Sequence, residues 1–250
     1  MTATGISRDP ASLSYLALRK AVGIVALTLP VALVIGYVIL TPLGSTGTWP
    51  NPPLLGSISA YYYSCMGHVF TGALCAIALF LLCTQGYDRA DEIAGYMACG
   101  FAFGVAFCPT APETASCGGT ITPLQKTMGM AHEIFAAALF LVLSYFCLFL
   151  FTKTTPDALP TRRKRQRNVV YKVCGAIMIF SMAVMTSLHI QAVGKLFQHI
   201  DMLLIFETVC LFAFGVAWLT KGEAILKDEE ASRSGSPAIA GEAEKQGMMV

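Results

Sequence analysis

Long apolar segments alternate with short polar ones along the whole chain. Each apolar segment is close to the roughly 20 residues of helix that cross a bilayer. Lipid offers no partners to backbone N–H and C=O groups, and runs this continuous lack the alternation of barrel strands, so the segments predict helices. We therefore expect an all-α, polytopic membrane protein, a bundle of six transmembrane helices over residues 20–42, 65–84, 92–109, 129–152, 169–191 and 198–220.

The composition supports the same class. Hydrophobic residues make up 55% of the chain and charged residues only 13%, with a mean hydropathy of +0.63. Soluble domains carry about 25% charged residues. The first apolar run follows Arg19 and Lys20 but is longer than the core of a signal peptide, about 7–15 residues, and no small-x-small cleavage site follows it. We therefore expect a retained span.

The distribution of basic residues predicts the orientation. Fifteen of the 17 lysines and arginines fall in segments on the N-terminal side of the bundle, and only Lys126 and Lys195 fall in loops on the other side. By the positive-inside rule, both termini are then cytoplasmic, in a bacterial cytoplasmic (inner) membrane. The basic run at 162–167 is expected to lie beside anionic lipid headgroups. No folded nucleic-acid-binding domain accompanies this basic run, so no nucleic-acid partner is expected.

The chain is predicted to have one folded domain. Residues 1–19 form a polar, loose or interfacial N-terminal segment, and residues 20–221 form the six-helix transmembrane domain. Residues 222–250 are poor in aromatic side chains, so we expect a disordered cytoplasmic tail.

Two cysteines in the second outer loop are candidates for a disulfide. Cys108 and Cys117 bracket "PTAPETAS" and would face an oxidising compartment. A bridge between them closes a loop of about ten residues, which stabilises a fold by about 2–3 kcal/mol. Cys65 is a competing partner.

Chemistry-bearing residues gather on the outer half of the predicted bundle. All four histidines lie there, and Glu133 adjoins one of them. Glu207 lies in the sixth span, about 12 Å deeper than His199. A carboxylate at that depth is costly unless it faces the bundle interior, a partner or water. It either lines a polar cavity that handles protons or cations, or makes an interhelical hydrogen bond that fixes the packing.

The stretch "SISAYYYSCMGH" lies at the outer end of the second span. Three consecutive residues of a helix point about 100° apart, so Tyr61, Tyr62 and Tyr63 cannot all line one pocket. We expect them in the outer aromatic belt, at the rim of any pocket. Ser64 and His68 are expected one turn apart on one helix face.

Three stretches, "SISAYYYS", "GALCAIALFLLCTQGYD" and "ETVCLFAFGVAWLTKG", resemble a group of bacterial multi-pass membrane proteins that has no assigned activity. The spacing from Ser64 to His68 is also similar to one motif of the CREST membrane hydrolases, which include alkaline ceramidases and progestin/adiponectin receptors. That resemblance implies a zinc site to which Ser64 and His68 contribute. The superfamily has seven spans and a closing H-x-x-x-H, whereas here Leu203 follows His199 four places later.

These observations predict an outward-facing polar pocket that binds or transports a small molecule or ion. The first alternative is a membrane-embedded, metal-dependent hydrolase that uses His68, His132 and His199, although no local ligand motif such as HExxH is present. The second is an electron carrier with one haem b between two facing histidines. Zinc and haem are possible cofactors, neither is favoured, and enzymatic activity is left open. The candidate lining residues are Ser64, His68, His132, Glu133, His189, His199 and Glu207.

Overall fold

The computed structural model describes residues 10–41, 54–83, 88–112, 121–153, 161–188, 190 and 201–226. These residues form helices and no strand, which confirms the all-α prediction, and each predicted apolar run corresponds to one α-helix. A short 3₁₀-helix, η1 (Ser59–Tyr63), precedes α2, and α4 continues into one turn of π-helix, η3 (Phe146–Leu150). The α-helices are α1 (Pro10–Leu40), α2 (Gly67–Leu82), α3 (Arg89–Phe107), α4 (Pro123–Tyr145), α5 (Arg162–Ser187) and α7 (Met202–Lys221).

Four helical stretches are long and apolar enough to cross a membrane. They are Tyr15–Leu40, Pro123–Leu150, Arg162–Ser187 and Met202–Lys221. The other two helices, α2 and α3, do not meet these conditions of length and apolar composition. α2 is apolar but has only 16 residues. α3 carries Arg89, Asp91 and Glu92 in its first turn.

Polar side chains define where α3 and α4 begin. The Asp88 carboxylate accepts hydrogen bonds from the N–H groups of Ala90 and Asp91 at the start of α3. The Thr122 hydroxyl accepts from the N–H of Gln125 at the start of α4, and the Gln125 side chain accepts from the N–H of Thr122, which completes a capping box. These contacts satisfy donors that a helix N-terminus otherwise leaves without partners.

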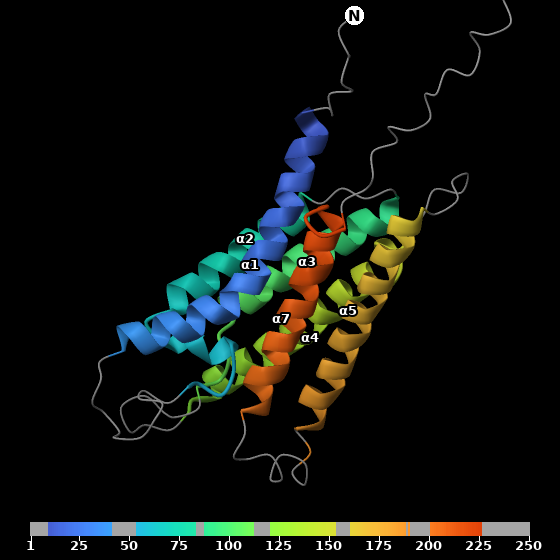
Figure 1. The fold of residues 1–250 in the computed structure, drawn as a ribbon. Coiled ribbons are helices and arrows are strands. Elements are labelled where there is room, and N and C mark those ends of the chain that lie inside the picture. The colour runs from blue at the N-terminus through green and yellow to red at the C-terminus, as the bar shows by residue number, and fades with distance from the viewer. Residues whose placement is uncertain are drawn as a thin grey trace, which may run out of the picture.

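α1 begins earlier than the hydropathy pattern indicates. The helix starts at Pro10, inside the segment expected to be a loose lead-in, and its first turns extend past the other helices (Figure 1). Pro30 lies within the helix. Proline lacks an N–H and its ring crowds the preceding turn, which bends a helix. The axis of α1 changes direction along its length in Figure 1.

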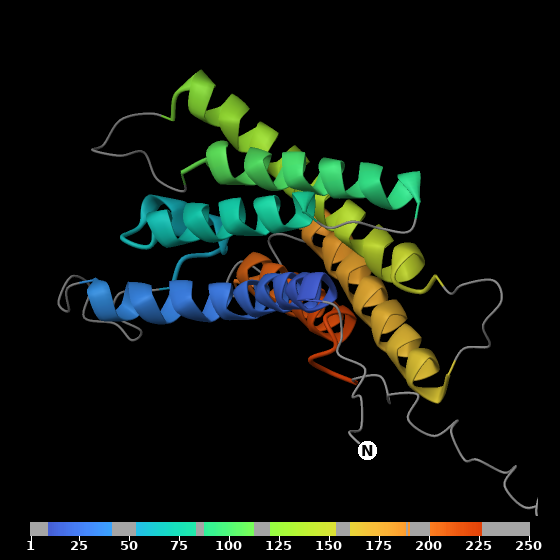
Figure 2. The same ribbon diagram turned by 90° about the horizontal axis from the view of Figure 1, so that it is seen from above.

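The helices form a closed ring. Each packs on its neighbours in the order α1, α2, α3, α4, α5, α7, and α7 returns to α1. α2 and α3 lie side by side in both views, while α5 runs obliquely to them (Figures 1 and 2). Contacts across the ring, between α4 and α7, are few.

Two glycines form the seam between α1 and α7. A Cβ at Gly23 would lie 2.9 Å from the carbonyl oxygen of Gly215, and a Cβ at Gly215 would lie 3.0 Å from the carbonyl oxygen of Gly23. The two backbones therefore approach each other at a distance that only glycine allows. This contact closes the ring.

An aromatic cluster fills one end of the ring. Trp218 is fully buried, and its ring centroid lies 4.8 Å from that of Phe151 and 5.4 Å from that of Phe146. Phe214 and Tyr171 extend the cluster to the middle of α7 and to α5. The cluster joins α5, α7 and the end of η3.

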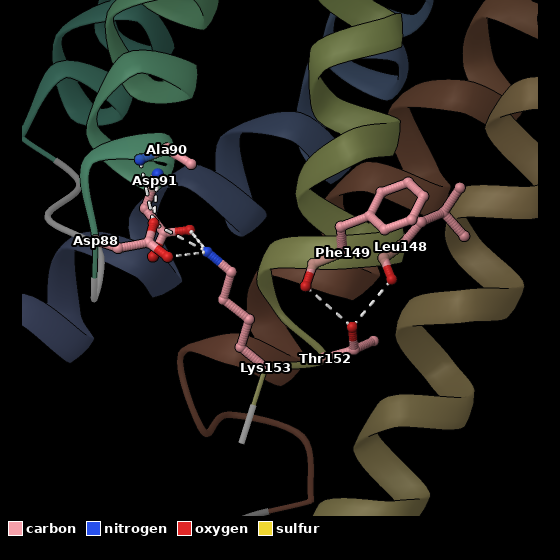
Figure 3. Close-up of polar contacts among 7 residues, drawn as sticks. All are labelled: Asp88, Ala90, Asp91, Leu148, Phe149, Thr152 and Lys153. Carbon is pink, nitrogen blue, oxygen red and sulfur yellow. Dashed lines mark hydrogen bonds and ion pairs between the residues drawn. The ribbon is translucent and has the colours of Figure 1, made fainter. Parts of the chain in front are cut away.

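Charged groups surround the same end of the bundle. The Lys153 ammonium lies 2.8 Å from an oxygen of Asp88 and 2.9 Å from an oxygen of Asp91, which ties the segment after η3 to the start of α3 (Figure 3). Beside it, the Thr152 hydroxyl donates to the carbonyls of Leu148 and Phe149 (Figure 3). We refer to this as the charged end.

Candidate functional site

At the end opposite the charged end, residues 54–66 form a segment that we call the roof. Two hydrogen bonds attach it to α7. The N–H of Leu204 donates to the carbonyl oxygen of Gly56 at 3.0 Å, and the N–H of Ile58 donates to Glu207 Oε2 at 2.5 Å. The roof is therefore held on α7 by one backbone contact and by the carboxylate that the sequence singled out.

Glu207 lies at the N-terminus of η1. Ile58 is the residue that precedes this 3₁₀-helix, and the carboxylate accepts its N–H. The Ser57 hydroxyl accepts a hydrogen bond from the N–H of Ala60, within η1, at 3.0 Å. Short helices expose N–H groups and a partial positive charge at this end, where a carboxylate is favourable. The described partner of Glu207 is therefore the backbone of the roof rather than a side chain on another transmembrane helix.

Two tyrosines of the roof, Tyr61 and Tyr63, have different environments. Tyr61 is fully buried against Tyr37 of α1, so its prediction as part of the aromatic belt is wrong. Burial also raises the pKa of the Tyr61 phenol. Tyr63 is exposed, and its hydroxyl donates to the carbonyl oxygen of Thr110 at 2.7 Å. The roof is thereby attached to the segment after α3 as well as to α7.

His132, in α4, lies against the end of α3. Only 4% of its surface is exposed, and its Nδ1 lies 2.6 Å from the carbonyl oxygen of Cys108, the residue that ends α3. A carbonyl oxygen only accepts hydrogen bonds, so this contact places a proton on Nδ1. In the neutral ring, Nε2 is then an acceptor.

Two adjoining cavities lie beneath the roof. The first, of about 60 Å³, is in the ring interior and has mainly apolar walls from α2, α4 and α7. The second, of about 150 Å³, lies between α4, α5 and α7, where Glu133 and Leu203 on its margin are exposed. The residues common to both linings are Ser59, His132, Ala136, Phe140 and Glu207. His132 and Glu207, distant in sequence, therefore line the same space.

Ser64 and His68 are not arranged as the sequence predicted. α2 begins at Gly67, so Ser64 precedes the helix and the two residues do not share a helix face. The Ser64 hydroxyl donates to the carbonyl oxygen of Tyr61 and accepts the N–H of Met66, which are turn contacts. The His68 side chain is exposed, and neither residue belongs to the lining of the two cavities.

The remaining candidates fall outside the described part of the chain. His189 and His199 are not among the described residues, and neither is Cys117, so the pairing of Cys117 with Cys108 stays a prediction. Within the described ranges, no group of three or more histidine, cysteine, aspartate or glutamate side chains could hold a metal ion. Of the zinc ligands suggested by the sequence, the two that are described differ in exposure: His132 is buried beneath the roof and His68 is exposed.

Three hydroxyl residues in the linings were not predicted from the sequence. They are Ser59 in the first and second cavities, and Thr110 and Thr186 in the second. Ser59 lies next to Ile58 and faces the Glu207 carboxylate with its backbone and side chain. A buried carboxylate needs hydrogen-bond donors, and the serines of "SISAYYYS" are donors on the same predicted outer half of the bundle as Glu207, which is the signal that could have identified Ser59.

No protein-family model, no curated protein and no solved structure matches this chain. The geometry of the two cavities is therefore the basis on which a function is assigned.

Proposed function

We propose that this protein crosses a bacterial cytoplasmic membrane six times, with both termini in the cytoplasm, and binds a small molecule in the paired cavities beneath the roof. Four of its helices are long and apolar enough to cross a membrane. Large apolar side chains also cover the outside of the ring. Ile24, Phe107, Ile134 and Phe180 are each more than half exposed, on four different helices. Apolar surface of this extent is unusual in a soluble monomer and is expected beside lipid.

The orientation is supported by the separation of charge between the two ends. Lys153, Lys164 and Lys221 belong to the charged end, where the Lys164 ammonium donates to the carbonyl of Phe151 and the Lys221 ammonium lies over the Phe151 ring. The basic run at 162–167 begins α5 at this same end. By the positive-inside rule the charged end is cytoplasmic, and the roof and cavities lie toward the outside.

The observation that carries the binding function is that His132 and Glu207 line one shared space. A polar pair among apolar walls is typical of small-molecule sites, in which a few polar groups orient a mainly apolar ligand. The alternatives of a metal-dependent hydrolase and a haem carrier have no comparable support. Each requires histidines that converge, and His68 and His132, the described ones, differ in exposure and surroundings.

The topology can be tested with alkaline phosphatase fusions, since the enzyme is active only outside the cytoplasm. Fusions within residues 42–53, 113–120 and 191–198 should be active, and fusions within 84–87, 154–160 and 227–250 should be inactive. Activity from any fusion in the second set would contradict six spans with cytoplasmic termini.

The binding site can be tested by filling it. Ala136 belongs to both linings, so Ala136→Phe places a ring in the shared space, whereas Ile134→Phe changes an exposed residue of the same helix outside the linings. Fragments that raise the melting temperature of the wild-type protein in lipid nanodiscs should also stabilise Ile134→Phe but not Ala136→Phe. If every such fragment stabilises both variants equally, the cavities are not the binding site.

A further inference from the structure

The charges around the two cavities are all of one sign. Two carboxylates, Glu133 and Glu207, contribute to the linings, and no lysine or arginine does so among the described residues. Lys126, the nearest basic residue along α4, is exposed and outside the linings. An anionic ligand would meet repulsion here, whereas a cation would be attracted.

Glu207 is placed at the junction of the cavities by its contact with the roof. Oε2 accepts the Ile58 N–H, which fixes the carboxylate, and the residue lines both spaces. The backbone donor at the start of η1 provides only a partial positive charge, which is less than the full charge of the carboxylate. Buried charges in proteins are normally paired, so a ligand with a positive donor group is the expected partner.

His132 lines the same space. Its Nδ1 proton is engaged by the carbonyl oxygen of Cys108, so the neutral ring has Nε2 for another donor. Ammonium groups donate three hydrogen bonds and accept none. An imidazole acceptor and a carboxylate in one lining therefore match a primary ammonium group better than an alcohol or a carboxylate ligand.

The remaining walls define the rest of the ligand. Phe70, Leu139, Leu143 and Phe214 surround the first cavity, and Phe140 lies on the wall shared with the second. An apolar cavity of about 150 Å³ accepts a molecule of the size of benzene. The second cavity has that volume and the first adjoins it.

We propose that the ligand is a small organic cation, a protonated primary amine carrying one apolar group about the size of a benzene ring. The ammonium lies between Glu207 and His132, and the apolar group lies in the second cavity against Phe140, Met182 and Met185. This inference rests on the proposed binding function and adds the charge and chemical class of the ligand.

The test uses three probes with the same ring and different charges: benzylammonium, benzyl alcohol and benzoate. Binding to the full-length protein in nanodiscs of zwitterionic lipid is measured by calorimetry, with empty nanodiscs as the reference for partition into lipid. Benzylammonium should bind about tenfold more tightly than benzyl alcohol, because a hydrogen bond to a charged partner is stronger than a neutral one. Benzoate should bind more weakly than either.

Glu207→Gln keeps the size of the side chain and an oxygen that accepts the Ile58 N–H, and it should abolish the preference for benzylammonium over benzyl alcohol. Glu92→Gln changes an exposed carboxylate of α3 and should leave that preference unchanged. Equal binding of the amine and the alcohol to the wild type, binding of none of the three, or a preference that persists in Glu207→Gln overturns the inference.

These outcomes are distinguishable from failure of the proposed function. If the amine and the alcohol bind equally and Ala136→Phe prevents both, the cavities bind small molecules but do not select a cation. If all three probes bind Ala136→Phe as they bind the wild type, the cavities are not the site, and both proposals fail.

Discussion

The backbone N–H of Ile58 donates to Oε2 of Glu207 across 149 positions of sequence, at 2.5 Å. This contact joins the roof to the last helix of the ring and places a carboxylate between two cavities. One residue thus serves the fold and the candidate site together, so substitutions there must separate the two roles.

Glu207→Leu should destabilise the protein, and Glu207→Gln should have little effect. Leucine leaves the Ile58 N–H without its acceptor, and an unsatisfied buried donor costs about 1–3 kcal/mol. The glutamine oxygen still accepts it. The free energies of unfolding of both variants, measured by denaturant titration in micelles, test whether Glu207→Leu is the less stable of the two.

Glu133→Leu is the matched control, because Glu133 is an exposed glutamate on α4. It should remain within about 0.5 kcal/mol of the wild type. Equal stability of Glu207→Leu and Glu133→Leu would mean that the roof does not depend on the carboxylate.

His132→Leu should weaken the contact between α3 and α4, whereas His132→Asn should retain most of it. The asparagine amide can donate to the Cys108 carbonyl from a position near that of Nδ1, and leucine cannot. A hydrogen bond of this type contributes about 0.5–1.5 kcal/mol. The melting temperatures of the two variants give the comparison, and a leucine variant as stable as the asparagine one would argue against the contact.

Much of the fold could be predicted from the sequence, because apolar length is a strong signal for a helix in lipid. Each of the six predicted runs contains a helix, although the ends differ by several residues. The roof could not be predicted in the same way. Its key contact uses the backbone N–H of Ile58, and a pattern of residue types does not predict which backbone groups form such contacts. Tyr61 lies in η1, which precedes the helix on which it was expected.

The candidate site could be predicted only in part, for a related reason. The depth of Glu207 in the sixth span marked it as needing a partner, and it lies in one lining with His132. Nothing in the sequence indicated that α4 and α7 face each other across the ring. Ser64 and His68 illustrate the reverse error, because a spacing of four residues has meaning only if a helix contains both, and α2 begins at Gly67.

Gly23→Ala should destabilise the bundle. The added methyl carbon would lie 2.9 Å from the Gly215 carbonyl oxygen, which is backbone and cannot move aside without separating α1 from α7. Overpacking of this kind costs about 1–3 kcal/mol. The free energy of unfolding of the variant provides the measurement.

Gly100→Ala is the control for that substitution, since a Cβ at Gly100 meets no atom within 4 Å. Alanine favours a helix interior over glycine by about 1 kcal/mol, so this variant should be as stable as the wild type or more so. A loss of stability at Gly100 equal to that at Gly23 would contradict a specific role for the seam.

The ion pair of Lys153 with Asp88 predicts a window of pH in which the charged end is most stable. The hydrogen bond from Lys153 lowers the pKa of the Asp88 carboxyl below its ordinary value of 3.8, so the stabilisation is complete above that value and is lost as the pH falls through the folded-state pKa. The same bond raises the pKa of Lys153 above 10.5, so its stabilisation is lost only as the pH rises through the higher value.

Lys153→Met should therefore reduce stability at neutral pH and have less effect at a pH low enough to protonate Asp88. Asp88→Asn should resemble it, because the amide oxygen still caps α3, whereas Asp88→Ala should be worse because it also removes the cap. Melting temperatures at several pH values distinguish these cases. An effect of Lys153→Met that is the same at every pH would show that the ion pair does not contribute.

The seam between Gly23 and Gly215 has a consequence for synthesis. It joins α1 to α7, which is synthesised after α1 to α5, so the ring stays open during translation until α7 has been made. A chain that ends before residue 202 contains α1 to α5, but it lacks both the seam and the carboxylate of Glu207. Such an incomplete chain would expose the face of α1 that carries Gly23, together with the cavity walls that α7 normally covers. It should therefore be recognised and degraded in the cell, while the chain that includes α7 is spared.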